Sequence, residues 1–199
     1  MADSYWNAGS DPYQHPGSKL LKNIPDIRNA AALDAFEQRA TMLRLDEMIA
    51  AIVGKPIDFP MWRTIHRVLF QDVYAWAGDI RSVQLAKGTT VFAMPEHIQA
   101  EADRLFAQLA IEDLPALSRD RLTARFAYYF GELNALHPFR EGNGRTQKLL
   151  FDEIARRAGY RIDWAAMDTD SLLQAVIAAF NNQDYRSLTQ LFDATLHSI

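Results

Sequence analysis

The chain has 199 residues, of which 49% are hydrophobic, and a net charge of −4. This length fits one domain with or without a small extension, and the acidic balance argues against direct nucleic-acid binding. The lack of cysteine excludes disulfides and thiolate metal sites, and no apolar run approaches the roughly 18 residues of a membrane span. The N-terminus has no basic start followed by an apolar stretch, so we expect a cytoplasmic protein with no membrane contact.

The first 18 residues are rich in Gly, Pro, Asp and Ser and are expected to form an extended arm or a loop. After them, apolar residues recur every three or four positions, which is typical of helices. Four such stripes are Leu33, Phe36, Ala40 and Leu43; Trp62, Ile65, Leu69, Val73 and Trp76; Ile98, Ala102, Leu105 and Leu109; and Leu122, Phe126, Tyr129, Leu133 and Leu136. The last stripe is the most regular, so its helix should be central.

Three more helices are predicted toward the C-terminus: from residue 143 or 144 to Ala158, from Ser171 to Phe180, and from Tyr185 to about Leu196. The exception to the helical pattern lies between Gly78 and Pro95. There residues 80–85 alternate apolar and polar side chains, Lys87-Gly88 is suited to a turn, and residues 90–92 favour a strand. The predicted fold class is therefore all-α, a helical bundle with a short β-hairpin that must pack on the body or receive a partner strand.

Residues 137–145 read His-Pro-Phe-Arg-Glu-Gly-Asn-Gly-Arg and carry the predicted chemistry. Pro138 disfavours a helical conformation at His137 and so ends the preceding helix there. The glycine-rich turn at the start of the next helix would direct backbone N–H groups and the positive helix end toward an anion. His137, with an ordinary pKa of about 6.5, can accept a proton from a hydroxyl. Glu141 offers the hard oxygen that Mg²⁺ prefers.

The remaining residues of this run suit phosphate binding. Gly142 and Gly144 allow the backbone to approach phosphate oxygens, Asn143 tolerates the turn and can donate an amide hydrogen bond, and Arg145 offers a planar fork. Each of these residues alone is more often structural. Together in nine residues they predict transfer of a phosphorus group from a magnesium-bound polyphosphate.

This run resembles the signature of the Fic family, His-Pro-Phe-x-(Asp/Glu)-Gly-Asn-Gly-Arg-x-x-Arg. Residues 62–83 are similar to the first core helix of that family and its run into the flap hairpin, and residues 87–98 to the second half of the flap. Residues 11–23 resemble the N-terminal extension of bacterial Fic toxins. The resemblance implies an N-terminal extension at residues 1–28 and a Fic domain at residues 29–199, with its core at about 55–197 and its flap at about 80–94.

By this resemblance the chain is a protein adenylyltransferase that uses ATP and Mg²⁺. His137 would deprotonate a hydroxyl of the target protein, which attacks the α-phosphorus while pyrophosphate leaves, and Glu141 would hold Mg²⁺. The flap would hold the target segment as an added strand. The implied nucleotide-binding residues are Lys87, Gly88, Glu141, Gly142, Asn143, Gly144, Arg145, Thr146, Gln147 and Lys148. At Lys148 the family has a second Arg, so the charge is kept but the bidentate fork is lost.

The resemblance also bears on regulation and partners. Many Fic proteins are silenced by a helix with the pattern (Ser/Thr)-x-x-x-Glu-(Gly/Asn). Here only Glu141 precedes Gly or Asn, and the residue four before it is His137, so the chain lacks this pattern. Within the family this absence implies a growth-arresting toxin that a separate small antitoxin inhibits. Analogy with family members points to subunits of DNA gyrase or topoisomerase IV as targets.

Two alternatives remain at this stage. A Doc-like protein kinase would look similar, but such kinases carry a lysine-containing loop in place of Gly-Asn-Gly-Arg. A catalytically weak peptide-binding module is favoured only by Lys148. The other histidines show no metal-ligand spacing and are interpreted as surface or packing residues, with a structural hydrogen bond expected for His66: they are His15, His66, His97 and His197.

Overall fold

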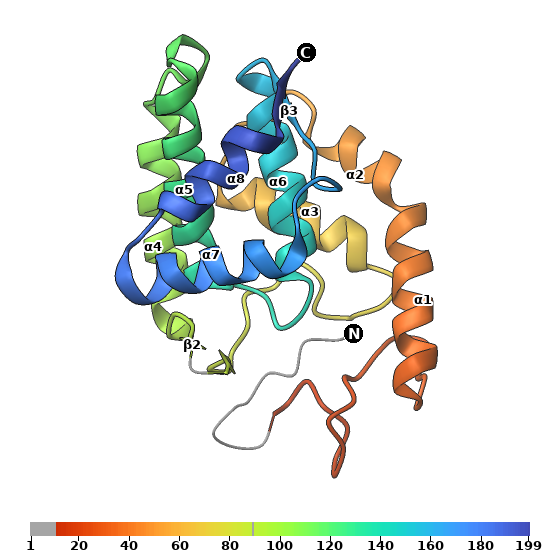
Figure 1. The fold of residues 1–199 in the computed structure, drawn as a ribbon. Helices are drawn as coiled ribbons and strands as arrows, with labels where there is room; N and C mark the ends of the chain where they lie inside the picture. The colour runs from red at the N-terminus through yellow and green to blue at the C-terminus, as the bar shows by residue number, and fades with distance from the viewer. Residues whose placement is uncertain (1–10, 89) are drawn as a thin grey trace.

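The computed structural model describes residues 11–88 and 90–199. These residues form a helical bundle with two small antiparallel strand pairs, which confirms the predicted all-α class (Figure 1). The helices are α1 (Ala30–Leu43), α2 (Leu45–Ile52), α3 (Phe59–Phe70), α4 (Pro95–Ala110), α5 (Arg119–Leu136), α6 (Asn143–Arg157), α7 (Thr169–Asn182) and α8 (Arg186–Thr195), with a short 3₁₀ helix at Leu114–Ala116. The strands are β1 (Ala86–Lys87), β2 (Thr90–Val91), β3 (Tyr160–Ile162) and β4 (Leu196–Ser198).

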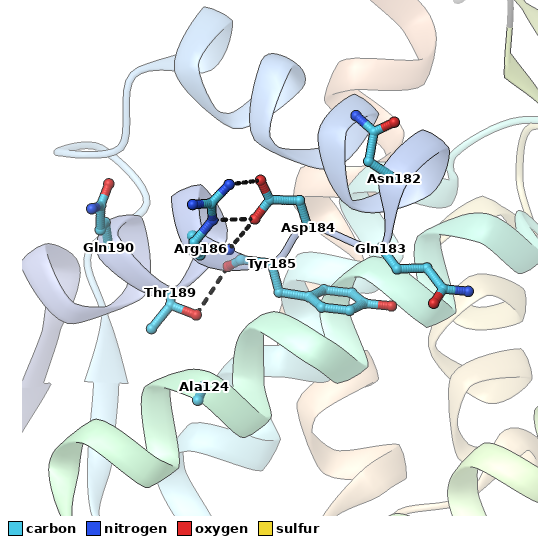
Figure 2. A pocket seen from close by; sticks show the side chains of 8 residues that line it. All are labelled: Ala124, Asn182, Gln183, Asp184, Tyr185, Arg186, Thr189 and Gln190. Atoms are coloured by element: carbon cyan, nitrogen blue, oxygen red, sulfur yellow. Dashed lines mark hydrogen bonds and ion pairs between the residues drawn. The ribbon is translucent and has the colours of Figure 1, made fainter.

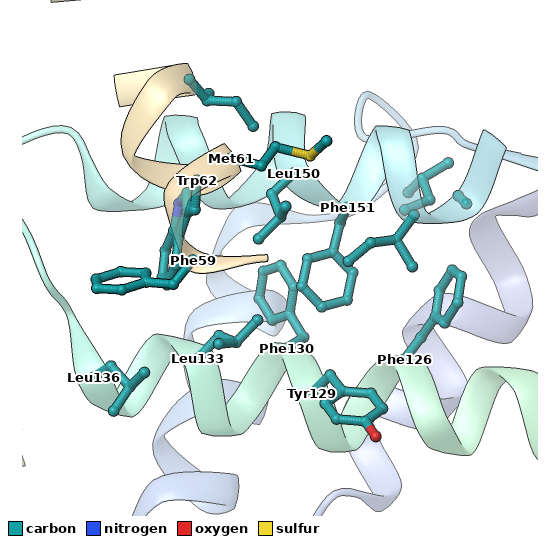
Figure 3. Packing of buried hydrophobic residues seen from close by; sticks show 14 of the residues in the cluster. Phe59, Met61, Trp62, Phe126, Tyr129, Phe130, Leu133, Leu136, Leu150 and Phe151 are labelled. Carbon is teal, nitrogen blue, oxygen red and sulfur yellow. The ribbon is translucent and has the colours of Figure 1, made fainter. Parts of the chain in front are cut away.

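Helix α5 lies at the centre of the bundle, as its regular apolar stripe predicts. It contacts α4, α6, α7 and α8, and every residue of the stripe is buried. Figure 3 shows α3 and α6 above α5, with aromatic rings from all three helices filling the space between them. Phe126 of α5 and Phe151 of α6 meet edge to face, with ring centroids 6.0 Å apart. Burial of such rings is the main favourable term in folding, so this contact fixes the two helices between which the 137–145 run lies.

The predicted helix at residues 62–76 is shorter in the structure. Asp58 caps α3 by accepting a hydrogen bond from the Met61 N–H, and the helix ends at Phe70. Val73 and Trp76 lie in a series of turns, although Val73 is fully buried. Turn residues that pack on a core can continue a helical stripe, and for that reason the periodicity overran the end of the helix.

The predicted hairpin is confirmed only in part, because β1 and β2 each have two residues and residues 80–85 form no strand. This segment is held instead by Arg81, whose side chain is 1% exposed. The guanidinium donates hydrogen bonds to four backbone carbonyl oxygens, those of Val83, Ala93, Leu136 and His137. The alternation of residues 80–85 thus reflects a buried arginine rather than a half-buried strand.

Two details of the first helices differ from the expectation, while the last helix and the described part of the N-terminal arm agree with it. Helix α2 was not predicted, and Leu43, predicted to share the apolar face of α1, is 83% exposed at the end of that helix. The last helix ends at Thr195, because Leu196 enters β4 and pairs with Ile162 of β3. Of the predicted arm, residues 1–10 lie outside the described part, and residues 11–18 form turns. Among the described residues, no helix combines the length and apolar character that crossing a membrane requires.

Candidate active site

His137 lies directly after α5 in a left-handed backbone conformation, with φ of +46°. Its imidazole is buried and stacks on Phe92 of the flap, with ring centroids 3.8 Å apart. Nδ1 faces the carbonyl oxygen of Asn134 at 3.4 Å, a contact that favours the tautomer with the proton on Nδ1. The structure therefore fixes the plane of the predicted base and the direction of its basic nitrogen.

The loop after His137 is closed by its own hydrogen bonds. The Asn143 side chain donates to the carbonyl oxygen of Phe139 at 2.8 Å and accepts from the Phe139 N–H at 2.9 Å. Phe139 is fully buried and packs edge to face on Trp62 of α3. Because both polar ends of the Asn143 amide are used within the loop, this side chain shapes the turn.

Gly142 is the N-cap residue of α6 with φ of +79°, and a Cβ at this position would overlap the ring of Phe70. This turn therefore requires glycine for both its backbone conformation and its packing. The Gly142 N–H donates to Oε1 of Glu141 at 2.9 Å. Glu141, predicted as the metal ligand, is only 6% exposed.

His66 supports the same turn from α3. Its Nδ1 accepts a hydrogen bond from the Gly78 N–H at 2.8 Å, so Nε2 carries the proton and donates to the Glu141 carbonyl oxygen at 2.9 Å. Burial lowers the pKa of His66 to about 3, which keeps the ring neutral. The ring also stacks on Phe139, with centroids 4.0 Å apart. The structural hydrogen bond expected for His66 is thus confirmed, and it fixes the backbone of the motif.

Two predicted nucleotide-binding residues of α6 point into the protein. Thr146 accepts a hydrogen bond from the Trp62 indole N–H at 3.2 Å, and Gln147 donates to the Phe130 carbonyl oxygen at 2.7 Å. Both side chains are buried. These residues hold the start of α6 against α3 and α5, which fixes the direction of the helix N-terminus and its positive end.

The two predicted cations, Arg145 and Lys148, lie one turn apart on α6 and have different partners. Nη2 of Arg145 lies 2.6 Å from Oε1 of Glu37 and 3.6 Å from Oε1 of Glu141. Lys148 instead places its ammonium 5.3 Å from the centre of the Trp164 ring. Arg145 therefore lies by two carboxylates, those of Glu37 and Glu141, whereas Lys148 lies over an aromatic ring.

The carboxylate of Glu141 fits a magnesium ion only together with a phosphate ligand. The described residues hold no group of three or more His, Asp or Glu side chains that could bind a metal on their own. Mg²⁺ typically takes one or two carboxylates and completes its shell with substrate phosphates and water. One hard carboxylate beside a helix N-terminus matches that donor set.

The flap reaches the motif through Phe92 and Ala93, which follow β2. Phe92 stacks on His137, and the Ala93 N–H donates to the Ala135 carbonyl oxygen at 3.0 Å. Lys87 ends β1 and Gly88 lies in the hairpin turn, with φ of +60° and open space where a Cβ would stand. The hairpin is thus anchored next to His137 through Phe92, and a Cβ at Gly88 would meet open space.

Comparison with known proteins gives this arrangement a family. The model of the Fic/DOC family matches residues 56–155. The chain belongs to the Fic/DOC family. A probable protein adenylyltransferase, y4lH of Sinorhizobium fredii, is 40% identical over 178 residues, which cover 88% of this chain and 91% of that protein. The probable protein adenylyltransferase Fic of Escherichia coli is 35% identical over 88% of this chain and 86% of that protein.

A solved relative shares the whole Fic fold. The N-terminal Fic domain of a VirB-translocated Bep effector protein from Bartonella quintana, with bound ADP, has a TM-score of 0.81 and 28% sequence identity. The match covers 94% of each chain. Together with the curated relatives, it confirms the predicted family, and the names of those relatives confirm the predicted enzyme class. This Fic protein is a nucleotidyltransferase of the protein adenylyltransferase class.

Several residues that shape the Fic site were not predicted from the sequence. Arg81 binds the carbonyl of His137, Phe92 stacks on its ring, and Glu37 pairs with Arg145. Glu37 and Arg145 are 108 residues apart, so no local pattern could indicate their contact. No signal in residues 80–85 singled out Arg81, because Ser82 and Gln84 are polar as well.

A pocket of about 1000 Å³ lies away from the Fic motif, between α5 and the connection from α7 to α8 (Figure 2). It is lined by Ala124, Asn182, Gln183, Asp184, Tyr185, Arg186, Thr189 and Gln190, and includes none of the predicted site residues. Asp184 and Arg186 form an ion pair at its edge. A smaller hollow of about 280 Å³ borders the flap and is lined in part by Phe92, Ala93 and Leu136.

Proposed function

We propose that this chain transfers AMP from ATP to a hydroxyl side chain of a target protein, with His137 as the general base. The observation that carries this proposal is the closed loop between α5 and α6. It holds His137, Glu141 and the start of α6 together, supported by the neutral ring of His66 and the packing of Phe70.

In the proposed reaction, Nε2 of His137 accepts the proton of the target hydroxyl as its oxygen attacks the α-phosphorus of ATP, and pyrophosphate leaves. The turn at residues 142–144 and the N–H groups at the start of α6 receive the phosphates, and Arg145 binds the distal ones. Glu141 would hold Mg²⁺, which neutralises phosphate charge when bound. The ADP in the Bartonella quintana relative supports an adenine nucleotide as the ligand.

The flap would bind the target as an additional strand. Val91 in β2 is 55% exposed, and the anchored base of the hairpin would bring a paired segment next to His137. Main-chain pairing sets the register of the segment without reading its side chains. Lys87 and Gly88 would border the nucleotide. The proposed domain boundary lies between residues 28 and 29, with the N-terminal extension before it and the catalytic domain after it.

The experiment that tests the activity uses labelled ATP, Mg²⁺ and bacterial lysate, with identification of the labelled protein. His137→Ala should abolish labelling, because general-base catalysis contributes about 10²–10⁴-fold. His97→Ala, a change to an exposed histidine, is the matched control and should label as wild type does. Intact mass of the product separates adenylylation from the phosphorylation that a Doc-like kinase would give. Equal labelling by wild type and His137→Ala would contradict the proposal.

The wider role proposed is that of a cytoplasmic growth-arresting toxin whose inhibitor is a separate small antitoxin carrying the inhibitory helix. The absence of the inhibitory pattern from the sequence supports this role. Co-expression with the product of the neighbouring gene should give a stable complex with suppressed transfer, and full activity in that complex would refute the role. DNA gyrase and topoisomerase IV subunits are the first purified targets to test.

A further inference from the structure

Glu37 is a buried carboxylate on α1, outside the residues that the Fic/DOC model matches. Its side chain is 9% exposed. Oε1 accepts a hydrogen bond from Nη2 of Arg145 at 2.6 Å, and Oε2 accepts one from the hydroxyl of Tyr74. Burial of a carboxylate is costly unless it is paired and hydrogen-bonded, and here each oxygen has a partner. The contact is therefore a built feature of the interior rather than a surface ion pair.

Tyr74 keeps this arrangement in place over the working pH range. Burial, followed by the charge of Glu37, raises the pKa of Tyr74 far above its usual value. The phenol thus stays protonated and donates to the carboxylate. Tyr74 is itself fixed by stacking on Trp76, with ring centroids 4.3 Å apart. Glu37 consequently presents one oxygen, Oε1, in a defined direction toward α6.

The contact with Glu37 determines which carboxylate Arg145 lies closest to. Its guanidinium lies over the Phe70 ring, 4.8 Å from the centroid, and its Nη2 is 1.0 Å closer to Glu37 than to Glu141, at 2.6 Å against 3.6 Å. A charge-assisted hydrogen bond at the shorter distance is the stronger of the two. Removal of Glu37 would leave Glu141 as the adjacent carboxylate and draw the guanidinium onto it.

We propose that Glu37 is a positioning residue, which holds the Arg145 guanidinium away from Glu141 so that both groups can engage the same nucleotide. A full ion pair between Arg145 and Glu141 would occupy the carboxylate meant for the metal and turn the guanidinium toward it. The α1 helix thereby forms part of the nucleotide site without touching the nucleotide. This inference rests on the proposed nucleotide role of residues 141–145.

The test measures the affinity of the whole chain for ATP with Mg²⁺ by calorimetry, which does not depend on AMP transfer. Glu37→Ala should weaken binding about tenfold. Glu37→Gln, which keeps an oxygen acceptor for Arg145, should recover part of that loss. Asp34→Asn is the matched control, since Asp34 lies on the same helix and its side chain contacts only Gln38 among the hydrogen bonds of the described residues. In transfer assays the KM for ATP should rise more than kcat falls.

A double-mutant cycle separates positioning from a merely structural role. In an Arg145→Ala background, Glu37→Ala should cause no further loss of ATP affinity, because its effect passes through the guanidinium. Additive losses, unchanged affinity in Glu37→Ala, or tighter binding would each overturn the inference. If Glu37→Ala does not fold, Glu37→Gln and Tyr74→Phe can each replace it in a cycle with Arg145→Ala. Wild-type protein that binds ATP but transfers no AMP would refute the proposed function and leave this test readable.

Discussion

The turn of the catalytic loop and the turn of the flap both contain a glycine with positive φ, but different forces hold them. At Gly142 a Cβ would overlap the Phe70 ring, whereas at Gly88 it would meet no atom within 4 Å. Tight packing therefore restricts the turn at Gly142, whereas no such packing surrounds a Cβ at Gly88. A reaction centre gains from preorganised groups, and under the proposed function the flap would gain from room for different target segments.

The most severe test of this comparison is Gly142→Ala. The added methyl group must enter the space of Phe70 at a backbone conformation that L-residues disfavour, so we expect a loss of about 2–4 kcal/mol in unfolding free energy. Transfer activity should fall with it, because the loop carries both His137 and Glu141. Denaturant unfolding measures the first effect and labelled ATP the second.

Gly144→Ala is the stability control for that substitution. Gly144 lies in α6 with nothing within 4 Å of the added Cβ, and alanine favours helix by up to about 1 kcal/mol. Its unfolding free energy should be equal to or above that of wild type. Similar losses for the two alanine variants would show that packing on Phe70 does not distinguish the catalytic turn.

A second prediction concerns pH and the neutral ring of His66. Burial lowers the pKa of His66 in the folded state to about 3 from an ordinary 6.5. As pH falls, His66 is therefore protonated in the unfolded chain before it is protonated in the folded protein. Stability is therefore full above pH 6.5 and is lost on acidification toward 3. At pH 5 the loss is about 2 kcal/mol. Unfolding curves at pH 7 and 5 should show a smaller difference for His66→Gln than for wild type, while the exposed His97→Gln should retain the wild-type difference.

The sequence allowed prediction of those parts of the site whose neighbours are local. His137, Glu141 and Gly142 share one loop, so their proposed roles follow from residues adjacent in the sequence, and the regular stripe of α5 correctly predicts the helix that precedes this loop. Contacts across the fold gave no such signal. Glu37 reads as an ordinary polar position on α1, and its partner Arg145 is 108 residues away.

The errors in the predicted secondary structure also arise because packing and contacts between distant residues leave no local pattern. Val73 and Trp76 continue the apolar stripe of α3 because turns also bury side chains, which placed the predicted helix end too late. Residues 80–85 alternate as a strand does, but their geometry depends on Arg81 reaching carbonyls up to 56 residues away. Hydrophobic periodicity indicates which residues are buried, but it does not indicate which groups form hydrogen bonds with their backbone.

A third prediction uses the turn of the flap. In Gly88→Ala the added methyl group meets no atom, so the cost comes from the left-handed backbone alone. We expect a loss of about 1 kcal/mol in unfolding free energy. The Gly88→Ala protein, which keeps His137, should still transfer the label from ATP, whereas Gly142→Ala should not. A destabilisation as large as that of Gly142→Ala would remove the distinction between the two turns.

The smallest effect is expected at Lys148. Its ammonium lies over Trp164, whose indole N–H donates to Asp152 at 2.7 Å, so this cation is already directed by an aromatic face. Lys148→Arg keeps the charge and the cation–π contact and adds a bidentate fork for phosphate, which should raise the transfer rate a few-fold. Single-turnover rates with saturating ATP measure this gain, with Lys55→Arg, an exposed lysine outside the motif, as the control. An unchanged rate would show that phosphate orientation relies on Arg145 and the start of α6, without help from the second cation.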